Sequence, residues 1–162
     1  MAFAFLLALA WQPASAAGAG TMPGDSAVIT LISVEQALLD LTNADRVANG
    51  LDPLEFDPET LLIARQRAEA QLGTAPLSHY DTDGGLAFVR MLEAAQVGYQ
   101  LAGENLARAS GDSAATTPQV EQALMKSPTH RKNILEKTFT RVAIGAATSP
   151  QGQITFAEVY RN

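Results

Sequence analysis

The sequence has 162 residues, no cysteine and a formal net charge of −6 at pH 7. Without cysteine, the chain has no disulfide framework, no thiol nucleophile and no thiolate metal site. The excess of acidic residues, with no run of Lys and Arg, argues against a nucleic-acid partner.

An uncharged apolar run opens the chain, and Gln12-Pro13 interrupts it. Ala14-Ser15-Ala16 then has the small-x-small pattern after which signal peptidase cuts. The run is shorter than the ~20 residues that span a bilayer, so we expect a removable signal peptide at residues 1–16 and no membrane span. The protein is therefore expected to be secreted or periplasmic. Residues 17–32 begin with a Gly- and Ala-rich stretch and are expected to be a flexible lead-in.

Three helices are predicted next, from apolar residues at helical spacing. The first has Ser33 as its N-cap and ends before Gly50. The second begins at Asp57-Pro58, with a carboxylate at the N-cap and proline at the first helical position, and Gly73 ends it. The third is stopped by Gly98.

A short extended segment at residues 99–102 is predicted to end at Gly103. Residues 110–117 are small and polar and are predicted to form a loop. A fourth helix then begins at Thr117-Pro118 and ends at Ser127, because the following proline disfavours helix at that residue.

Near the C-terminus the hydrophobic period changes from helical to alternating. Apolar residues alternate over 142–146 and again over 154–160, on either side of a Ser-Pro-Gln-Gly turn, which predicts a β-hairpin. Helices followed by a late hairpin predict an α+β fold, with helices packed on a small antiparallel sheet.

Three residues could carry chemistry. His79 and His130 are the two histidines of the chain, and both lie in loop-like or helix-end segments. Glu104 follows Gly103, where the absence of a side chain lets the backbone approach another group closely. Two imidazoles and a carboxylate suit acid–base chemistry or a divalent metal, although spacing alone does not bring them together.

An ordered set of short motifs runs through residues 34–160. It consists of Leu41-Thr42-Asn43-Ala44-Asp45-Arg46, Leu51-Asp52-Pro53-Leu54, the segment from Ala64 to Ala68, Ser78-His79, Arg90, Gly98, Gly103-Glu104-Asn105-Leu106-Ala107, the segment from Met125 to Leu135, Phe139 and Gly145. In these motifs the chain resembles the CAP superfamily of cysteine-rich secretory, antigen five and pathogenesis-related proteins (SCP-like), and more closely its short, disulfide-free bacterial branch. The resemblance implies a CAP domain over residues 33–162, folded as a three-layer α-β-α sandwich with the small antiparallel sheet between helices.

The resemblance also implies a cleft lined by two histidines and two acidic residues. His79 and His130 match the histidines, and Glu104 matches the first acid. Ser127 stands at the position of the second acid, so we expect three of the four cleft positions to be filled. Glu158, where the family usually has Gln, is a further candidate for the missing carboxylate.

His79 and His130 could bind Zn²⁺ or a similar divalent metal, with Glu104 as a third ligand or as the acceptor that orients one imidazole. The same three residues are the candidates for catalysis. Alternatively, Glu104 only satisfies buried polar groups or caps a helix. Arg131 and Lys132 are expected to be solvated rather than phosphate-binding, because the chain as a whole is acidic.

Beside a stable envelope or matrix component with no ligand, two functions remain open on the sequence. One is an exported binding and signalling module whose cleft holds a divalent metal or small ligand, with a lipid or cell-envelope component as a further partner. The other is a metal-assisted hydrolase acting on peptide or cell-wall material. Neither Ser78 nor Ser127 forms a recognisable nucleophile pair with its neighbouring histidine, so a serine hydrolase is not expected.

Overall fold

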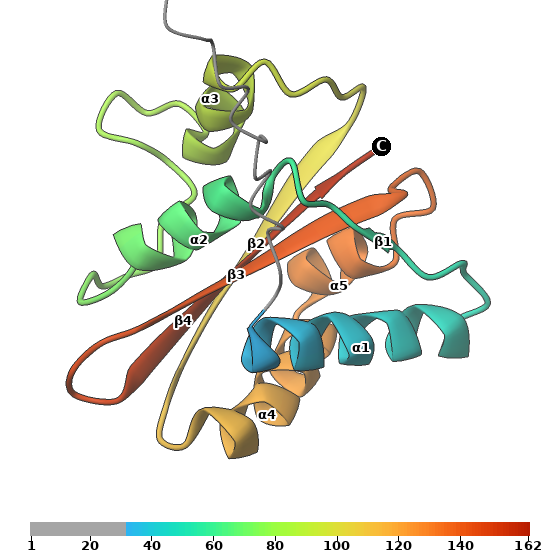
Figure 1. The fold of residues 1–162 in the computed structure, drawn as a ribbon. Coiled ribbons are helices and arrows are strands. Elements are labelled where there is room, and N and C mark those ends of the chain that lie inside the picture. Colours follow the sequence, from blue (N-terminus) through green and yellow to red (C-terminus); the bar gives the residue numbers. More distant parts are fainter. Residues whose placement is uncertain (1–31) are drawn as a thin grey trace, which may run out of the picture.

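The computed structural model describes residues 32–162 (Figure 1). The expected signal peptide at residues 1–16, and all but the last residue of the expected lead-in, lie outside the described residues. The elements are α1 (Ser33–Ala48), β1 (Glu55–Phe56), α2 (Leu61–Ala70), α3 (Ala87–Ala94), β2 (Ala102–Ser110), α4 (Ser113–Lys126), α5 (Pro128–Ile134), β3 (Arg141–Thr148) and β4 (Gln153–Arg161). Within residues 32–162, no helix has the length and apolar character needed to cross a membrane.

The four strands form one sheet in the order β1-β3-β4-β2. The predicted hairpin is confirmed as β3 and β4, which pair antiparallel, and β2 pairs antiparallel with the other edge of β4. The two-residue strand β1 adds a parallel edge beside β3. Helices α2 and α3 cover one face of the sheet, and α1, α4 and α5 cover the other (Figure 1). The predicted three-layer α-β-α sandwich is therefore confirmed.

Each face of the sheet has its own hydrophobic core, because successive side chains of the central strands β3 and β4 point to opposite faces. Ile144 and Phe156 pack against α1 and α4, whereas Ala143 and Val159 pack against α2 and α3. Gly145 lets α2 approach β3 very closely: a Cβ there would lie 2.2 Å from the carbonyl carbon of Ala64. The position therefore requires a residue without a side chain.

Two predicted helix starts are wrong. The second helix begins at Leu61 rather than after Asp57, because the Asp57 carboxylate binds the Arg161 guanidinium and the Thr60 hydroxyl. The fourth begins at Ser113, where Asp112 acts as N-cap and accepts a hydrogen bond from the Ala115 amide at 3.3 Å. Part of the predicted loop is thus helical.

The first helix and the extended segment also differ in detail from the prediction. Ser33 is the first helical residue, Ile32 is the N-cap residue, and the Glu35 carboxylate accepts a hydrogen bond from the Ile32 amide at 3.0 Å. Strand β2 begins at Ala102 and runs through Gly103 to Ser110, so Glu104 lies within a strand rather than at its end. Its side-chain direction is therefore set by the pleat of the sheet.

Candidate functional site

The structure places the three predicted site residues on three separate elements. Glu104 lies in β2, His79 lies in the loop between α2 and α3, and His130 lies in α5. His79 and Glu104 are in direct contact, with Nδ1 of the imidazole 2.7 Å from Oε2 of the carboxylate. Burial lowers the pKa of His130, and a positive charge on His79 would lower it further.

Arg67, on α2, determines how Glu104 is held. Its Nε donates to Oε1 of Glu104 at 2.7 Å, and its Nη2 donates to Oε2 at 3.1 Å and to the carbonyl of Ser78 at 2.7 Å. The Arg67 and Glu104 side chains are only 5% and 1% exposed, so this is a buried bidentate ion pair. Through Ser78, Arg67 also holds the backbone next to His79.

The sequence analysis did not single out Arg67. The available signal was an arginine on the buried face of α2, between Ala64 and Ala68 and inside one of the motifs shared with the CAP superfamily. A cation at such a position requires a buried acceptor. Sequence spacing does not reveal that this acceptor is Glu104, 37 residues further on.

The contact with Glu104 selects the tautomer of His79. A carboxylate paired with arginine is a hydrogen-bond acceptor, so Nδ1 of His79 is assigned the proton and Nε2 keeps its lone pair. Among the described residues, Nε2 of His79 has no hydrogen-bond partner, and the side chain is 37% exposed. The free nitrogen is therefore available to a metal, a proton or a ligand.

Two asparagines connect α5, which carries His130, to β2. The Asn105 amide donates to the carbonyl of His130 at 3.2 Å. The Asn133 amide donates to the carbonyl of Glu104 at 3.2 Å and to the side-chain oxygen of Asn105 at 2.9 Å. The close approach expected at Gly103 is present, since a Cβ there would lie 3.0 Å from Cζ of Phe139.

The structure supplies no second acid in the cleft at the two positions considered. The hydroxyl of Ser127 lies 3.2 Å from that of Thr129. Glu158 is 1% exposed, and its carboxylate accepts hydrogen bonds from Tyr160, Asn105 and Thr42 on the α1 side of the sheet. Glu158 therefore does not replace the missing carboxylate.

Glu158 belongs instead to a buried acidic pair with Glu121 of α4. The Thr42 hydroxyl lies 3.1 Å from Oε2 of Glu121 and 3.3 Å from Oε1 of Glu158. Burial, followed by the charge of Glu158, raises the pKa of Glu121 to about 9, and burial also raises the pKa of Glu158. Oε1 of Glu121 is buried without a hydrogen-bond partner among the described residues, which costs less free energy for a neutral carboxyl group than for a carboxylate.

The described residues contain no group of three or more His, Asp or Glu side chains that could hold a metal ion. Both oxygens of Glu104 are already bonded to Arg67 or His79, so the carboxylate has no unbonded oxygen to offer a metal.

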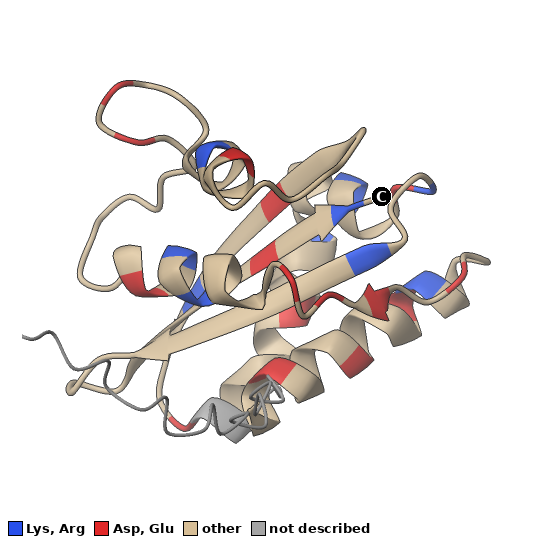
Figure 2. Cartoon of the chain, turned by 45° about the horizontal axis from the view of Figure 1, so that its top comes forward, with Lys and Arg blue, Asp and Glu red and all other residues tan. Residues whose placement is uncertain are grey.

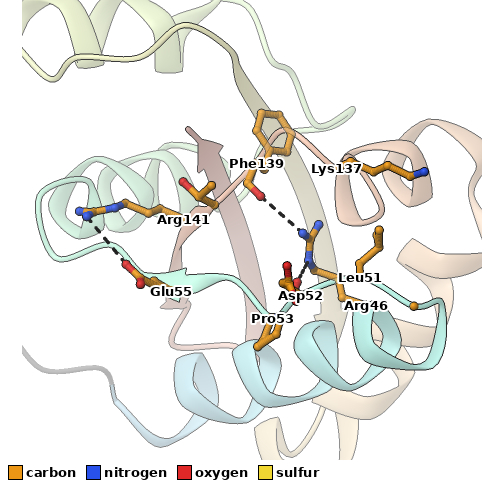
Figure 3. A pocket seen from close by; sticks show the side chains of 10 residues that line it. Arg46, Leu51, Asp52, Pro53, Glu55, Lys137, Phe139 and Arg141 are labelled. Atoms are coloured by element: carbon orange, nitrogen blue, oxygen red, sulfur yellow. Dashed lines mark hydrogen bonds and ion pairs between the residues drawn. The ribbon is translucent and has the colours of Figure 1, made fainter.

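A separate cavity of about 580 Å³ lies where the loop after α1 faces the segment before β3 (Figure 3). Its lining includes Leu51, Lys137 and Phe139 but none of the three predicted site residues. Arg46 extends beside it and donates to the backbone carbonyls of Asp52, Ile134, Glu136 and Phe139, so it connects three segments of the chain. Arg46 is thus a structural residue at this cavity.

Comparison with known proteins gives matches over most of the described chain. The family model described as CAP, cysteine-rich secretory protein family, matches residues 39–160. The Bacillus subtilis protein YkwD is 32% identical over 124 residues, which are 76% of this chain and 46% of YkwD. The Bacillus subtilis membrane protein YlbC is 34% identical over 111 residues, which are 68% of this chain and 31% of YlbC. The chain therefore spans less than half the length of both relatives.

Solved structures show the same fold. An extracellular protein with an SCP domain from Bacillus anthracis is 28% identical with a TM-score of 0.62, over 80% of this chain and 40% of that one. An outer surface protein from Borrelia burgdorferi is 15% identical with a TM-score of 0.67, over 83% and 96% of the two chains. NaASP2, solved with Zn²⁺, is 12% identical with a TM-score of 0.56, over 78% of each chain. The last two establish likeness of fold alone.

Proposed function

Because the chain belongs to the cysteine-rich secretory protein (CAP) family, we propose that it is an exported binding module whose His79–His130 cleft holds a divalent metal and, through it, a small ligand. Export is supported by the signal pattern at residues 1–16 and by the likeness to an extracellular SCP-domain protein from Bacillus anthracis. The single observation that carries the metal proposal is the 2.7 Å contact between Nδ1 of His79 and Glu104.

That contact matches the usual support of a metal-binding histidine, in which a carboxylate accepts the proton of one ring nitrogen and leaves the other for the metal. His130 contributes a second imidazole, and its lowered pKa favours the neutral form that a metal requires. In this proposal Glu104 orients His79 and is not itself a ligand, because Arg67 already occupies its carboxylate.

The donor set suits a borderline cation such as Zn²⁺, which accepts imidazole nitrogen. With only two protein nitrogens, binding should be weaker than at a four-ligand structural site, and the remaining positions would be open to water or to a donor group of the ligand.

The geometry does not favour hydrolysis. A metal-assisted hydrolase needs a base near the attacking water, and both oxygens of Glu104 are bonded to Arg67 or His79. Ser127 places a hydroxyl, not a carboxylate, where a second acid was expected. Binding is therefore the function that these residues support best.

An NMR titration of the two histidine ring signals with Zn²⁺ at pH 7 tests the proposal. We expect both sets of signals to shift together, with the His79→Gln and His130→Gln variants each abolishing the joint response. Glu104→Gln should weaken binding by about tenfold or more, because the amide orients the imidazole less well.

Two results would count against the metal site. One is that each histidine titrates independently and ignores Zn²⁺. The other is that Zn²⁺ binds equally well after either histidine is replaced. Circular dichroism of each variant separates loss of the site from loss of the fold.

A further inference from the structure

The lysines of this chain are not spread over its surface. All three lie within residues 126–137: Lys126 ends α4, Lys132 lies in α5 and Lys137 follows it. With Arg131 and Glu136, this segment carries four cations and one carboxylate, a net charge of +3 in a chain whose net charge is −6. Figure 2 shows acidic residues over α1, β1 and the loop before α3, and basic residues on α5.

Most cations elsewhere in the described chain have acidic partners. The ion pairs are Arg65–Glu35, Arg67–Glu104, Arg90 with Asp81 and Asp83, Arg141–Glu55, and Arg161 with Asp57 and Glu59. By contrast, Nζ of Lys126 donates to the side-chain oxygen of Gln122 at 3.0 Å, and Nη2 of Arg131 donates to that of Asn49 at 3.1 Å. These neutral partners fix the direction of the cations without cancelling their charge.

Lys126, Arg131 and Lys132 line one groove of about 510 Å³ between the end of α4 and α5, here called the α4–α5 groove. Pro128 and Leu135 supply apolar wall, and Glu136 is the acidic residue of the lining. The Glu136 carboxylate accepts a hydrogen bond from the Thr138 amide at 2.9 Å, and that bond, with the charge of Lys132, lowers its pKa. The groove therefore keeps a surplus of two positive charges around a hollow of small-molecule size.

We propose that the α4–α5 groove binds a phosphate ester. Phosphate presents several anionic oxygens at once, which suits two ammonium groups and a forked guanidinium better than the two oxygens of a carboxylate do. The carbon part of the ester would lie against Pro128 and Leu135. The groove shares no lining residue with the histidine cleft, so this site is independent of the proposed metal site.

The sequence analysis expected Arg131 and Lys132 to be solvated because the chain is acidic. Net charge averages over the whole surface, whereas a ligand in a groove responds mainly to charges within about 10 Å, the screening length at 0.1 M salt. Folding pairs most of the arginines with acidic side chains, whereas residues 126–137 keep a surplus of positive charge. The local charge is therefore opposite in sign to the global charge.

The test uses the full chain, labelled with ¹⁵N, and two phosphate probes. Glycerol 3-phosphate represents a soluble ester, and vesicles of phosphatidylglycerol, compared with vesicles of phosphatidylcholine, represent a lipid headgroup. We expect amide shifts confined to residues 126–136 with the soluble ester, or co-sedimentation with the anionic vesicles only.

The matched variants separate a local site from net charge. Lys126→Gln with Lys132→Gln should weaken binding of whichever probe binds by about tenfold, the effect of losing one or two charge-assisted contacts. The control, Arg90→Gln with Arg141→Gln, changes net charge equally but removes exposed cations outside the groove, and it should bind as the parent does.

Binding of the soluble ester identifies a free phosphate ester as sufficient, whereas binding of anionic vesicles alone identifies a lipid headgroup. The proposal is overturned if neither probe binds at 50 mM salt, or if both double variants weaken binding equally. It is also overturned if a single-stranded oligonucleotide binds more tightly than either probe, because the groove would then serve a nucleic acid.

Discussion

At the residue scale, the chemistry of the cleft depends on the partner of one carboxylate. Glu104 accepts hydrogen bonds from Arg67 through both oxygens and from His79 through one. Because the ion pair is almost fully buried, neither charge can be solvated by water if its partner is lost. Arg67 is therefore as important to the site as the histidines, although it presents no group to a ligand.

Replacement of Arg67 by methionine should destabilise the fold by about 3 kcal/mol or more, because it leaves the Glu104 charge buried and unpaired. The Arg67→Met, Glu104→Gln double variant should recover part of this loss, since no isolated charge remains. Urea denaturation of the parent, both single variants and the double variant measures the coupling. A loss below about 1 kcal/mol for Arg67→Met would show that the pair is solvated.

At the element scale, the packing of α2 on β3 places Arg67 beside Glu104. Ala64 and Ala68 are fully buried, and Gly145 of β3 sits directly below the backbone of α2. Small residues on both elements bring the helix close to the sheet. Arg67, one turn along from Ala64, can then reach β2.

Gly145→Ala should therefore be strongly destabilising. Its Cβ would lie 2.2 Å from backbone atoms of Ala64 and Arg65, which cannot rotate away as a side chain can. We expect a loss of more than about 3 kcal/mol in thermal or urea unfolding. Gly98→Ala is the matched control, because nothing lies within 4 Å of its Cβ, and a change within about 1 kcal/mol is expected there. Equal effects at both positions would mean that α2 is not held this close.

At the scale of the whole molecule, the buried acids make stability depend on pH. Glu121 faces Glu158 and Tyr160 of β4 and Asp45 and Thr42 of α1, and its pKa is raised from 4.5 to about 9. Between these values the folded chain keeps a proton that the unfolded chain releases. The contribution of Glu121 to the free energy of unfolding should therefore be highest below pH 4.5. It should fall as the pH rises towards 9.

Glu121→Gln should flatten this dependence, because an amide imitates the neutral carboxyl group and does not ionise. The stability of the variant relative to the parent should therefore rise from pH 5 to pH 8, by on the order of 1.4 kcal/mol or less for each pH unit. Urea unfolding at pH 5, 7 and 8 measures it, with Glu93→Gln as an exposed control. Parallel profiles for the parent and Glu121→Gln would contradict a protonated Glu121.

Much of this architecture is already contained in local sequence patterns. Helical spacing and glycine stops predict α1, α2 and α3, and alternation on either side of a turn predicts the β3–β4 hairpin. These features depend on neighbouring residues, so they can be recognised without a fold. The motifs around His79, Glu104 and His130 likewise identify the family and name three residues of the candidate site.

Tertiary structure decided which groups meet. Asp57 was expected to begin α2, but Arg161, 104 residues further on, binds its carboxylate. Glu104 and Glu158 both lie on strands, and the register of β2 on β4 directs them to opposite faces of the sheet, one to Arg67 and the other to Thr42. A shift of β2 by one residue would bring Glu104 to the same face as Glu158, and no local pattern fixes that choice.

The sequence by itself therefore determined the first three helices and the hairpin, the family and the identity of the three candidate residues, because periodicity and motifs are local. Only the fold determined the pairing of Arg67 with Glu104 and the burial of Glu121 beside Glu158. Each of these is a contact between segments far apart in the chain. Its energy depends on distance and burial, which packing alone sets.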